Sequence, residues 1–290
     1  IADMNAYKAN LDGSVFKSAM IMRPVFEAAR TVKRTIVFAE GEDERVLRAS
    51  QAIMEETTDT PILIGRPDVI AQRCERAGLK IRPGVDFSIV NPENDPRYRD
   101  YWETYHNLMA RKGVTPDLAK AIMRTNTTAI GAVMVQRGEA DSLICGTFGQ
   151  FLWHLNYVTQ ILGDKVLHPV GALSLMILED GPLFVADTQV HPEPSPPQIA
   201  ETVISCARHI KRFGVTPRIA LCSHSQFGNL DCDTGQRMRA AMAILDSAPR
   251  DFVYEGEMHI DTALDVNLRN RIFPNAHLPG PANCLIFANT

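Results

Sequence analysis

Residues 218–231 read RIALCSHSQFGNLD, and this stretch decides the fold. Its apolar run at 219–222 is long enough for a buried strand, and it breaks into small polar residues and glycine. In an open α/β sheet, ligands lie beyond the carboxyl ends of such strands. Serine and glycine let backbone N–H groups approach an anion, and serine hydroxyls add donors. The stretch therefore predicts an anion-binding loop, with an ordinary strand-to-helix loop as the alternative.

The same organisation recurs along the chain. Short apolar runs alternate with helical patterns, which is typical of βαβ units and a mostly parallel sheet. A hairpin is the one antiparallel element that we expect. We therefore predict an α/β fold. The further strand candidates are residues 35–39, 61–65, 86–91, 141–145, 171–178, 181–187, 252–256 and 283–288.

Three strand ends supply the candidate ligand-binding residues. Each is a glycine or a small polar residue in the loop that follows a predicted strand, where N–H and O–H donors face a ligand. We expect no catalytic residue, because there is no G-x-S-x-G elbow and triads are built from distant positions. Neither G-x-G-x-x-G nor a Walker A motif is present. The candidates are Gly146, Thr147, Ser223, Ser225, Gly228, Asn289 and Thr290.

Composition excludes several classes of protein. The 290 residues are 45% hydrophobic with a net charge of −4, which argues against a nucleic-acid partner. No window is apolar over the ~20 residues of a membrane span, so we expect no membrane partner. Six cysteines without a C-x-x-C pair suit a reducing cytoplasm. The histidines form no H-x-x-x-H pair, and we predict no metal site.

Two clusters have structural interpretations that we favour over functional ones. The acidic run at 40–44 is typical of a capped helix start, and a metal site would need more converging oxygens. Tyr98, Tyr101, Trp102 and Tyr105 repeat at three and four residues, which is typical of a core or interface stripe rather than a cofactor site.

Several longer motifs together resemble the phosphotransacetylase (phosphate acetyl/butyryl transferase) family. They include IVFAEGEDERVLRA at 36–49, GEADSLICG at 138–146 and YEGEMHIDTAL at 254–264. The blocks NDPRYRDYW at 94–102 and LCSHSQFGNLDC at 221–232 resemble more closely the phosphotransacetylase-like C-terminal domain of bacterial hybrid NADP-dependent malic enzymes.

The resemblance implies two α/β domains with an interdomain cleft, the isocitrate/isopropylmalate dehydrogenase-like fold. We expect a linker or lead-in helix over 1–30, a first domain over 31–145 and a second domain with a dimer interface over 146–290. Since the chain starts at Ile1 and stops at Thr290, we expect both ends to be cuts through a longer polypeptide. The first domain would then lack its C-terminal part, and the family's Ser-Arg pair and Asp would lie beyond Thr290.

The sequence departs from the active family at the catalytic cations. An ungapped match places Met109 at one arginine position. The family pattern S-G-A-x-H-(S/T)-T-A-D-T-x-R reads CGTFGQFLWHLN here, so Phe151 replaces a threonine and Asn156 replaces an arginine. Without these guanidinium groups, the fixed forks that grip phosphate are missing.

The resemblance therefore implies a noncatalytic domain that binds acetyl-CoA as an allosteric effector, self-associates as a dimer or higher oligomer, and regulates a malic enzyme domain. NADP and a divalent metal would belong only to that N-terminal domain. One alternative is an active phosphate acetyltransferase that converts acetyl-CoA and phosphate to acetyl phosphate and CoA. The other is a purely structural dimerisation domain.

Overall fold

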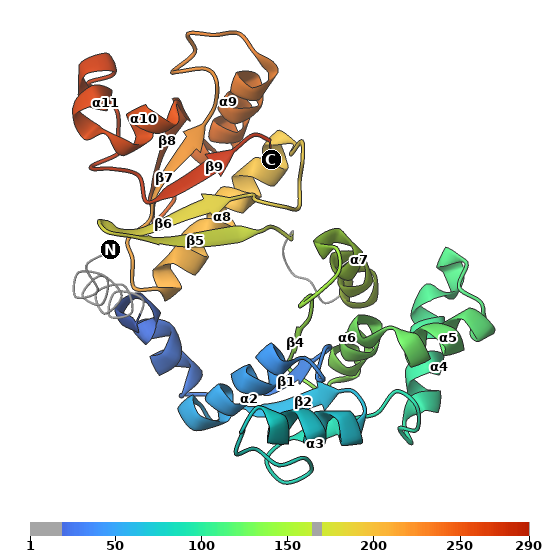
Figure 1. The fold of residues 1–290 in the computed structure, drawn as a ribbon. Helices are drawn as coiled ribbons and strands as arrows, with labels where there is room; N and C mark the ends of the chain where they lie inside the picture. The colour runs from blue at the N-terminus through green and yellow to red at the C-terminus, as the bar shows by residue number, and fades with distance from the viewer. Residues whose placement is uncertain (1–18, 164–169, 290) are drawn as a thin grey trace, which may run out of the picture. The chain divides into compact units, whose positions relative to one another are not determined.

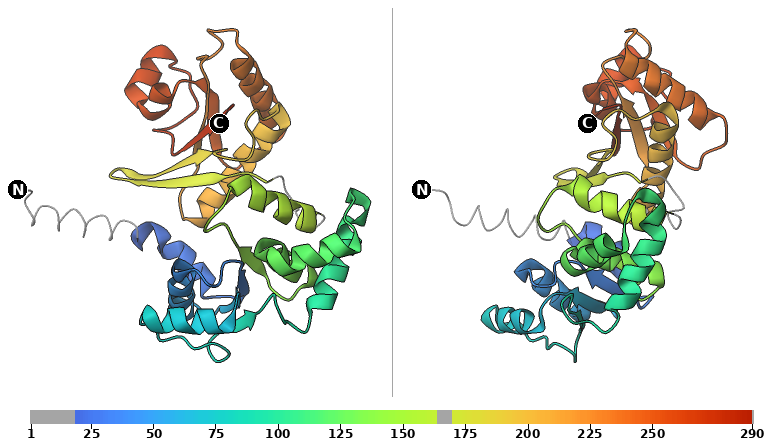
Figure 2. Two further views of the ribbon diagram at one scale, coloured as in Figure 1. Left: turned by 45° about the vertical axis from the view of Figure 1, so that its right-hand side comes forward. Right: turned by 90° about the vertical axis from the view of Figure 1, so that its right-hand side faces the viewer.

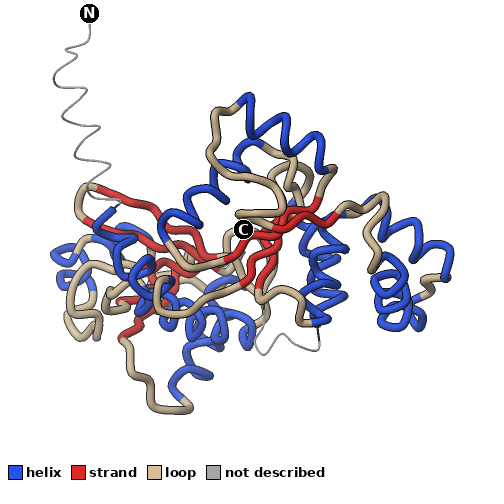
Figure 3. Tube along the Cα trace, turned by 90° about the horizontal axis from the view of Figure 1, so that it is seen from below, coloured by secondary structure: helices blue, strands red, loops and turns tan. Residues whose placement is uncertain are grey.

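The computed structural model describes residues 19–163 and 170–289, which form two compact units (Figure 1). One unit is Phe26–Leu167, and the other joins Ile1–Val25 to His168–Thr290. Helices and strands alternate along both (Figure 3), so the predicted α/β class is confirmed. No described helix has the length and apolar character that crossing a membrane requires.

The unit Phe26–Leu167 contains a four-stranded, fully parallel sheet in the order β3-β2-β1-β4. Its strands are β1 (Thr35–Phe38), β2 (Thr60–Ile64), β3 (Ser88–Val90) and β4 (Ser142–Ile144). Its helices are α2 (Glu44–Glu56), α3 (Pro67–Arg76), α4 (Tyr98–Met109), the 3₁₀ turn η1 (Ala110–Lys112), α5 (Pro116–Thr125), α6 (Thr127–Arg137) and α7 (Phe151–Leu162).

Each face of this sheet has its own core, because successive strand residues point to opposite faces. Val37 packs with α4 to α7, whereas the next residue, Phe38, packs with α2 and α3. Tyr101 and Tyr105 are each 2% exposed within the first of these cores, and Tyr98 and Trp102 pack against it. The aromatic stripe of α4 is therefore core, as predicted.

The acidic run after β1 begins a helix, as predicted. Asp43 is the N-cap of α2, and its side chain accepts a hydrogen bond from the N–H of Arg45. Glu42 makes a bidentate ion pair with the Arg66 guanidinium, with N–O distances of 2.8 Å. The hydrogen bond to Arg66 lowers the pKa of Glu42, and burial opposes this shift.

The second unit contains a five-stranded sheet in the order β5-β6-β9-β7-β8. The hairpin β5–β6 is antiparallel, and Figure 2 shows its two long neighbouring arrows. All the other pairs are parallel. The strands are β5 (Leu173–Leu178), β6 (Gly181–Ala186), β7 (Arg218–Cys222), β8 (Val253–Met258) and β9 (Cys284–Phe287). The helices are α8 (Pro196–Arg212), α9 (Asp233–Asp246), α10 (Ile260–Leu264) and α11 (Val266–Ile272).

This sheet also separates two cores. Ile219 and Leu221 of β7 face α8 and α9, whereas Ala220 and Cys222 face the side that carries Ala263 of α10. The apolar run at 219–222 is buried on both faces, which is why it lacks the polar alternation of a surface strand.

The loop after β6 is organised by one carboxylate. Asp187 accepts hydrogen bonds from the backbone N–H groups of Ala172, Gln189 and Val190 and, at 2.6 Å, from Nδ1 of His191. Burial acts to raise its pKa, but these hydrogen bonds outweigh burial and hold the pKa of Asp187 below its usual value. The proline-rich segment that follows leads directly into α8.

The boundary between the units lies later in the chain than the sequence indicated. We expected the first domain to end at 145, but the compact unit extends to Leu167. The reason is α7, which packs against α6 and α4 and adds Ile161 to their core. Of the expected lead-in helix over 1–30, residues 19–29 are helical, and residues 1–18 lie outside the described part.

Candidate functional site

A cavity lies at the carboxyl ends of β7, β8 and β9, where parallel strand topology places ligand sites. Its volume is about 560 Å³, within the ~300–1,000 Å³ range of small-molecule sites. The ends of three strands meet there because β7 lies between β8 and β9. The lining residues are Cys222, Ser223, His224, Thr234, His259, Ile260, Asp261, Phe287, Ala288 and Asn289.

Two predicted ligand-binding residues, Ser223 and Asn289, meet in this cavity. Ser223 Oγ accepts the N–H of Ser225 at 3.1 Å and lies 3.4 Å from Oγ1 of Thr234. Thr234 is in the first turn of α9, so the N-terminal end of that helix borders the cavity. The cavity therefore offers hydroxyl, amide and helix N-terminal donors.

Ser225 and Gly228 belong to an internal network instead. Ser225 is fully buried, and its hydroxyl donates to the carboxylate of Glu257 at 2.6 Å. The same oxygen of Glu257 accepts the N–H of Gly228 at 3.0 Å and Nη1 of Arg239 at 2.6 Å. A protein carboxylate thus occupies the donors that the sequence assigned to an anionic ligand. The network fixes the loop whose first residue, Ser223, lines the cavity.

The remaining predicted residues lie elsewhere. Gly146 and Thr147 belong to the unit Phe26–Leu167, at the end of β4. The N–H of Gly146 donates to both carboxylate oxygens of Glu40 at 3.1 Å. The Thr147 hydroxyl oxygen is buried and has no hydrogen-bond partner within the described residues. Thr290 lies outside them.

The described lining of the cavity contains hydroxyl groups, two imidazole rings and one carboxylate. Of the ten described residues that line it, none is Arg or Lys. Burial raises the pKa of the Cys222 thiol to about 12, so this thiol stays protonated at neutral pH. The described part of the chain contains no group of three His, Cys, Asp or Glu side chains that could hold a metal ion.

The residues that β8 and α9 contribute to the cavity are not among those predicted from the sequence. His259 and Asp261 lie near the end of β7 because β8 and β7 are neighbouring parallel strands, whereas Thr234 reaches Ser223 from the first turn of α9. His259 Nε2 lies 3.1 Å from the carbonyl oxygen of His224, which links the loops after β8 and β7.

The two positions at which the resemblance expects arginine carry no cation. Met109 is 3% exposed and belongs to the apolar core of Phe26–Leu167. Asn156 is exposed on α7, and its Oδ1 accepts the side-chain amide of Gln160 at 2.8 Å. Neither side chain can hold a phosphate group as a guanidinium does.

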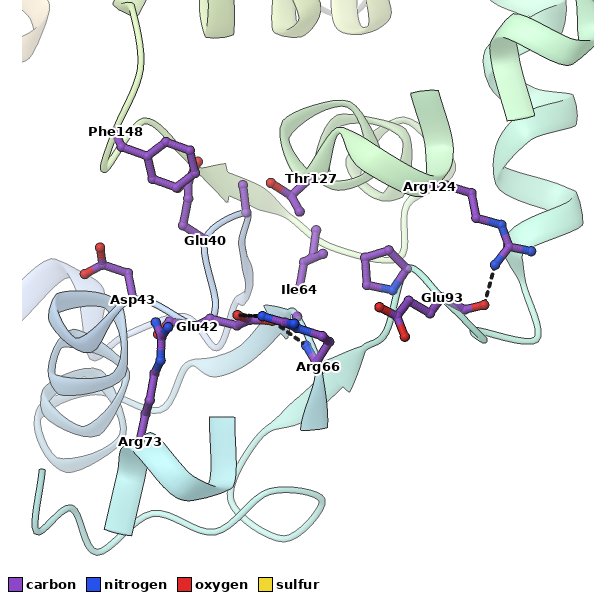
Figure 4. Close-up of a pocket in the computed structure, with 13 residues that line it drawn as sticks. Glu40, Glu42, Asp43, Ile64, Arg66, Arg73, Glu93, Arg124, Thr127 and Phe148 are labelled. Carbon is purple, nitrogen blue, oxygen red and sulfur yellow. Dashed lines mark hydrogen bonds and ion pairs between the residues drawn. The ribbon is translucent and has the colours of Figure 1, made fainter. Parts of the chain in front are cut away.

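A second cavity, of about 490 Å³, lies within the unit Phe26–Leu167 at the carboxyl ends of β1 and β2 (Figure 4). Carboxylates and guanidinium groups both line it, together with an aromatic ring. Its labelled residues are Glu40, Glu42, Asp43, Ile64, Arg66, Arg73, Glu93, Arg124, Thr127 and Phe148.

Comparison with known proteins places these observations in a family. The sequence profile described as "Phosphate acetyl/butaryl transferase" matches residues 20–290. The chain belongs to this family. A phosphotransacetylase from Streptococcus pyogenes has the same fold, with a TM-score of 0.82 at 24% identity over 92% of this chain and 82% of that one.

Two relatives of this chain are malic enzymes. The chain is 50% identical over its whole length to an NAD-dependent malic enzyme of Rhizobium meliloti (strain 1021). It is 42% identical, again over its whole length, to an NADP-dependent malic enzyme of Escherichia coli (strain K12). In both cases the chain spans 38% of the length of the relative.

Proposed function

We propose that this chain is the phosphotransacetylase-like regulatory domain of a malic enzyme and that it binds acetyl-CoA as an allosteric effector. It also mediates self-association. The preceding malic enzyme domain would decarboxylate malate oxidatively with NADP and a divalent metal. One relative is named an NAD-dependent enzyme and the other an NADP-dependent enzyme. The choice of NADP as the cofactor therefore rests on the motif resemblance.

The observation that carries this proposal is the buried side chain of Met109. Acyl transfer to phosphate develops negative charge, and removing one group that stabilises such charge typically lowers the rate by about 10²–10³-fold. A cation at residue 109 would have to reside in an apolar core, because Met109 is 3% exposed there. Asn156 is neutral as well. If the ungapped match holds, the chain combines the family fold with the absence of two charges that the family's chemistry would use.

The cavity of Ser223 and Asn289 supports ligand binding. Its volume of about 560 Å³ suits part of a molecule such as acetyl-CoA. Its hydroxyl, amide and helix N-terminal donors match carbonyl and phosphate oxygens. Such a ligand would regulate a second site if it bound two conformations of the whole protein with different affinities.

Calorimetric titration with acetyl-CoA tests the proposal. We expect saturable binding that Ser223→Ala weakens about tenfold, as the loss of about 1.4 kcal/mol would. Ser247→Ala is the matched control, because Ser247 is exposed at the end of α9 and does not line the cavity. In the longer protein, acetyl-CoA should change the rate of malate oxidation. Absence of acetyl-CoA binding to the chain would refute the proposal.

An active phosphate acetyltransferase is the second candidate, which the family description favours. A coupled assay of acetyl phosphate formation distinguishes it from the regulatory domain. Turnover near that of a true phosphotransacetylase would show that the chain is catalytic and would refute the proposal of a noncatalytic regulatory domain. Self-association without any ligand binding would support the third possibility, a purely structural dimerisation domain.

A further inference from the structure

The cavity at the carboxyl ends of β7, β8 and β9 has two histidines in its lining. His224 follows β7, and His259 follows β8. None of the described residues that line this cavity is lysine or arginine. Proteins usually hold phosphate and carboxylate groups with guanidinium or ammonium groups. The two imidazole rings are therefore the only side chains of the described lining that can present a positive charge to a ligand.

A hydrogen bond of His259 determines which of its ring nitrogens can change state. Nε2 lies 3.1 Å from the carbonyl oxygen of His224. A carbonyl oxygen only accepts, so Nε2 carries a proton in both the neutral and the charged ring. Nδ1 is then an acceptor in the neutral ring and a donor in the charged one. Protonation of His259 thus adds a donor and a positive charge without breaking the link between the two loops.

The backbone that carries His224 is fixed on both sides. The Oγ of Ser223, the preceding residue, accepts the N–H of Ser225 at 3.1 Å. Ser225 is fully buried, and its hydroxyl donates to Glu257. The His224 side chain itself is exposed and lines the cavity. A ligand in the cavity can therefore approach this ring without rearranging the loop.

Three other titratable groups lie at or beside the cavity. Asp261 is an exposed carboxylate in its lining. The thiol of Cys222 stays protonated, because burial raises its pKa to about 12. Cys232 does not line the cavity, but its Sγ lies 3.4 Å from Oγ1 of Thr234, and this hydrogen bond lowers the pKa of the thiol. The charge of the described lining is thus −1 with neutral imidazoles and +1 when both are protonated.

The ion pairs of the loop after β7 do not supply a free cation to the cavity. Nη1 of Arg239 lies 2.6 Å from Oε1 of Glu257, and Nη2 lies 3.8 Å from Oδ1 of Asp231. Arg239 is therefore paired with two carboxylates, and it does not line the cavity. Histidine is the side chain whose charge ordinarily changes between about pH 5 and 8. The sign of the charge in the described lining therefore depends on pH.

We infer that His224 and His259 are the anion-binding side chains of this cavity and that they bind an oxyanion of the ligand in their protonated form. The inference rests on the proposed ligand-binding role of the cavity and adds a regulation by pH. Because the ligand selects the protonated rings, binding takes up protons and becomes tighter as the pH falls. The hydroxyl groups of Ser223 and Thr234 are donors at every pH and contribute the part of the affinity that does not change.

Calorimetry with sulfate tests the inference, because sulfate keeps its full charge over this range of pH. We expect its dissociation constant to rise about tenfold from about pH 5.5 to about pH 8, as two charge-assisted hydrogen bonds are lost. His224→Gln and His259→Gln should each reduce this ratio about threefold, and the double variant should abolish it. His209→Gln is the matched control and should retain the full ratio, because His209 is exposed on α8 and does not line the cavity. Cys232→Ser should retain it as well.

Proton uptake is a second measurement, which a purely structural role of the histidines would not affect. At about pH 6.5, the enthalpy of sulfate binding should depend on the ionisation enthalpy of the buffer and give a net uptake of protons. The double variant should show no uptake. Equal sulfate affinities of the wild type at the two pH values would overturn the inference. A pH dependence that persists in the double variant, or that disappears in Cys232→Ser alone, would also overturn it.

Competition with acetyl-CoA identifies the source of the oxyanion. If acetyl-CoA displaces sulfate, a phosphate group of acetyl-CoA occupies the site, and both proposals are supported. If sulfate binds with the expected pH dependence and acetyl-CoA does not compete, the ligand is a free oxyanion; the inference then holds and the acetyl-CoA proposal fails for this cavity. If acetyl-CoA binding depends on Ser223 but sulfate binds at neither pH, the inference is overturned and the proposed function stands. A thermal melt of each variant at both pH values verifies that the protein remains folded.

Discussion

Arg269 is a buried cation that ties one end of the second unit together. It is fully buried in α11, and Nη1 donates to the carbonyl oxygens of Thr262 and Ala263 at 3.0 and 3.1 Å. Nη2 donates to the carbonyl oxygens of Leu278 and Gly280 at 3.1 and 2.6 Å. One side chain thus joins α10 to the segment that leads into β9, and burial lowers its pKa.

We predict that Arg269→Met lowers the free energy of unfolding by about 3 kcal/mol. Four carbonyl oxygens would lose their donor, at about 1 kcal/mol each. Burying a guanidinium costs desolvation free energy, and the variant no longer has this cost. Its removal offsets part of the loss, as it does when other buried charges are replaced by apolar groups. Since the free energy of unfolding of domains is about 5–15 kcal/mol, the variant should remain folded but unfold at a lower temperature and a lower urea concentration than the wild type.

Urea denaturation followed by circular dichroism measures the effect. Arg271→Met is the control, because Arg271 lies on the same helix and is exposed. We expect the control to change stability by less than about 0.5 kcal/mol. Arg269→Lys should fall between the two, since one ammonium has three donors for four acceptors. Equal stabilities of the Arg269→Met and Arg271→Met variants would refute the reasoning.

Three further predictions concern charge. Glu257→Gln should cost about 2 kcal/mol in urea denaturation, because it weakens three hydrogen bonds to a buried carboxylate. Asp231→Asn, at an 82% exposed side chain, should have no such effect. The pKa of Asp187 is lowered in the folded protein, so its ionised carboxylate stabilises the fold. This contribution to the free energy of unfolding is fully present above the unfolded pKa of about 3.9 and is lost as the pH falls through the folded pKa. The difference in urea midpoint between wild type and Asp187→Asn should therefore narrow below about pH 4; a constant difference down to pH 3 would contradict this. Met109→Arg should destabilise the protein by about 3 kcal/mol or more without producing acetyl phosphate, whereas Asn156→Arg should be neutral in thermal melts.

The elements were predictable where a single local pattern determines them. The apolar run at 219–222 became β7, and the aromatic stripe at 98–105 became core because its spacing matches one helix face. The roles of individual donors were not predictable in this way. Ser225 and Glu257 are 32 residues apart, and nothing in either local pattern indicates that the carboxylate would fill the serine loop. Likewise, the end of the first unit depends on where α7 packs, which the composition around 145 does not show.

The position of β9 has a consequence for folding during synthesis. Although β9 is the last described strand in sequence, it lies between β6 and β7. Roughly 100 residues separate the end of β6 from β9, and translation at about 5–20 residues per second takes about 5–20 s to add them. During that interval β5–β6 and β7–β8 can form only as separate pairs with open inner edges. Open strand edges are templates for pairing with other chains. The nascent protein therefore passes through an aggregation-prone stage that ends when β9 closes the sheet.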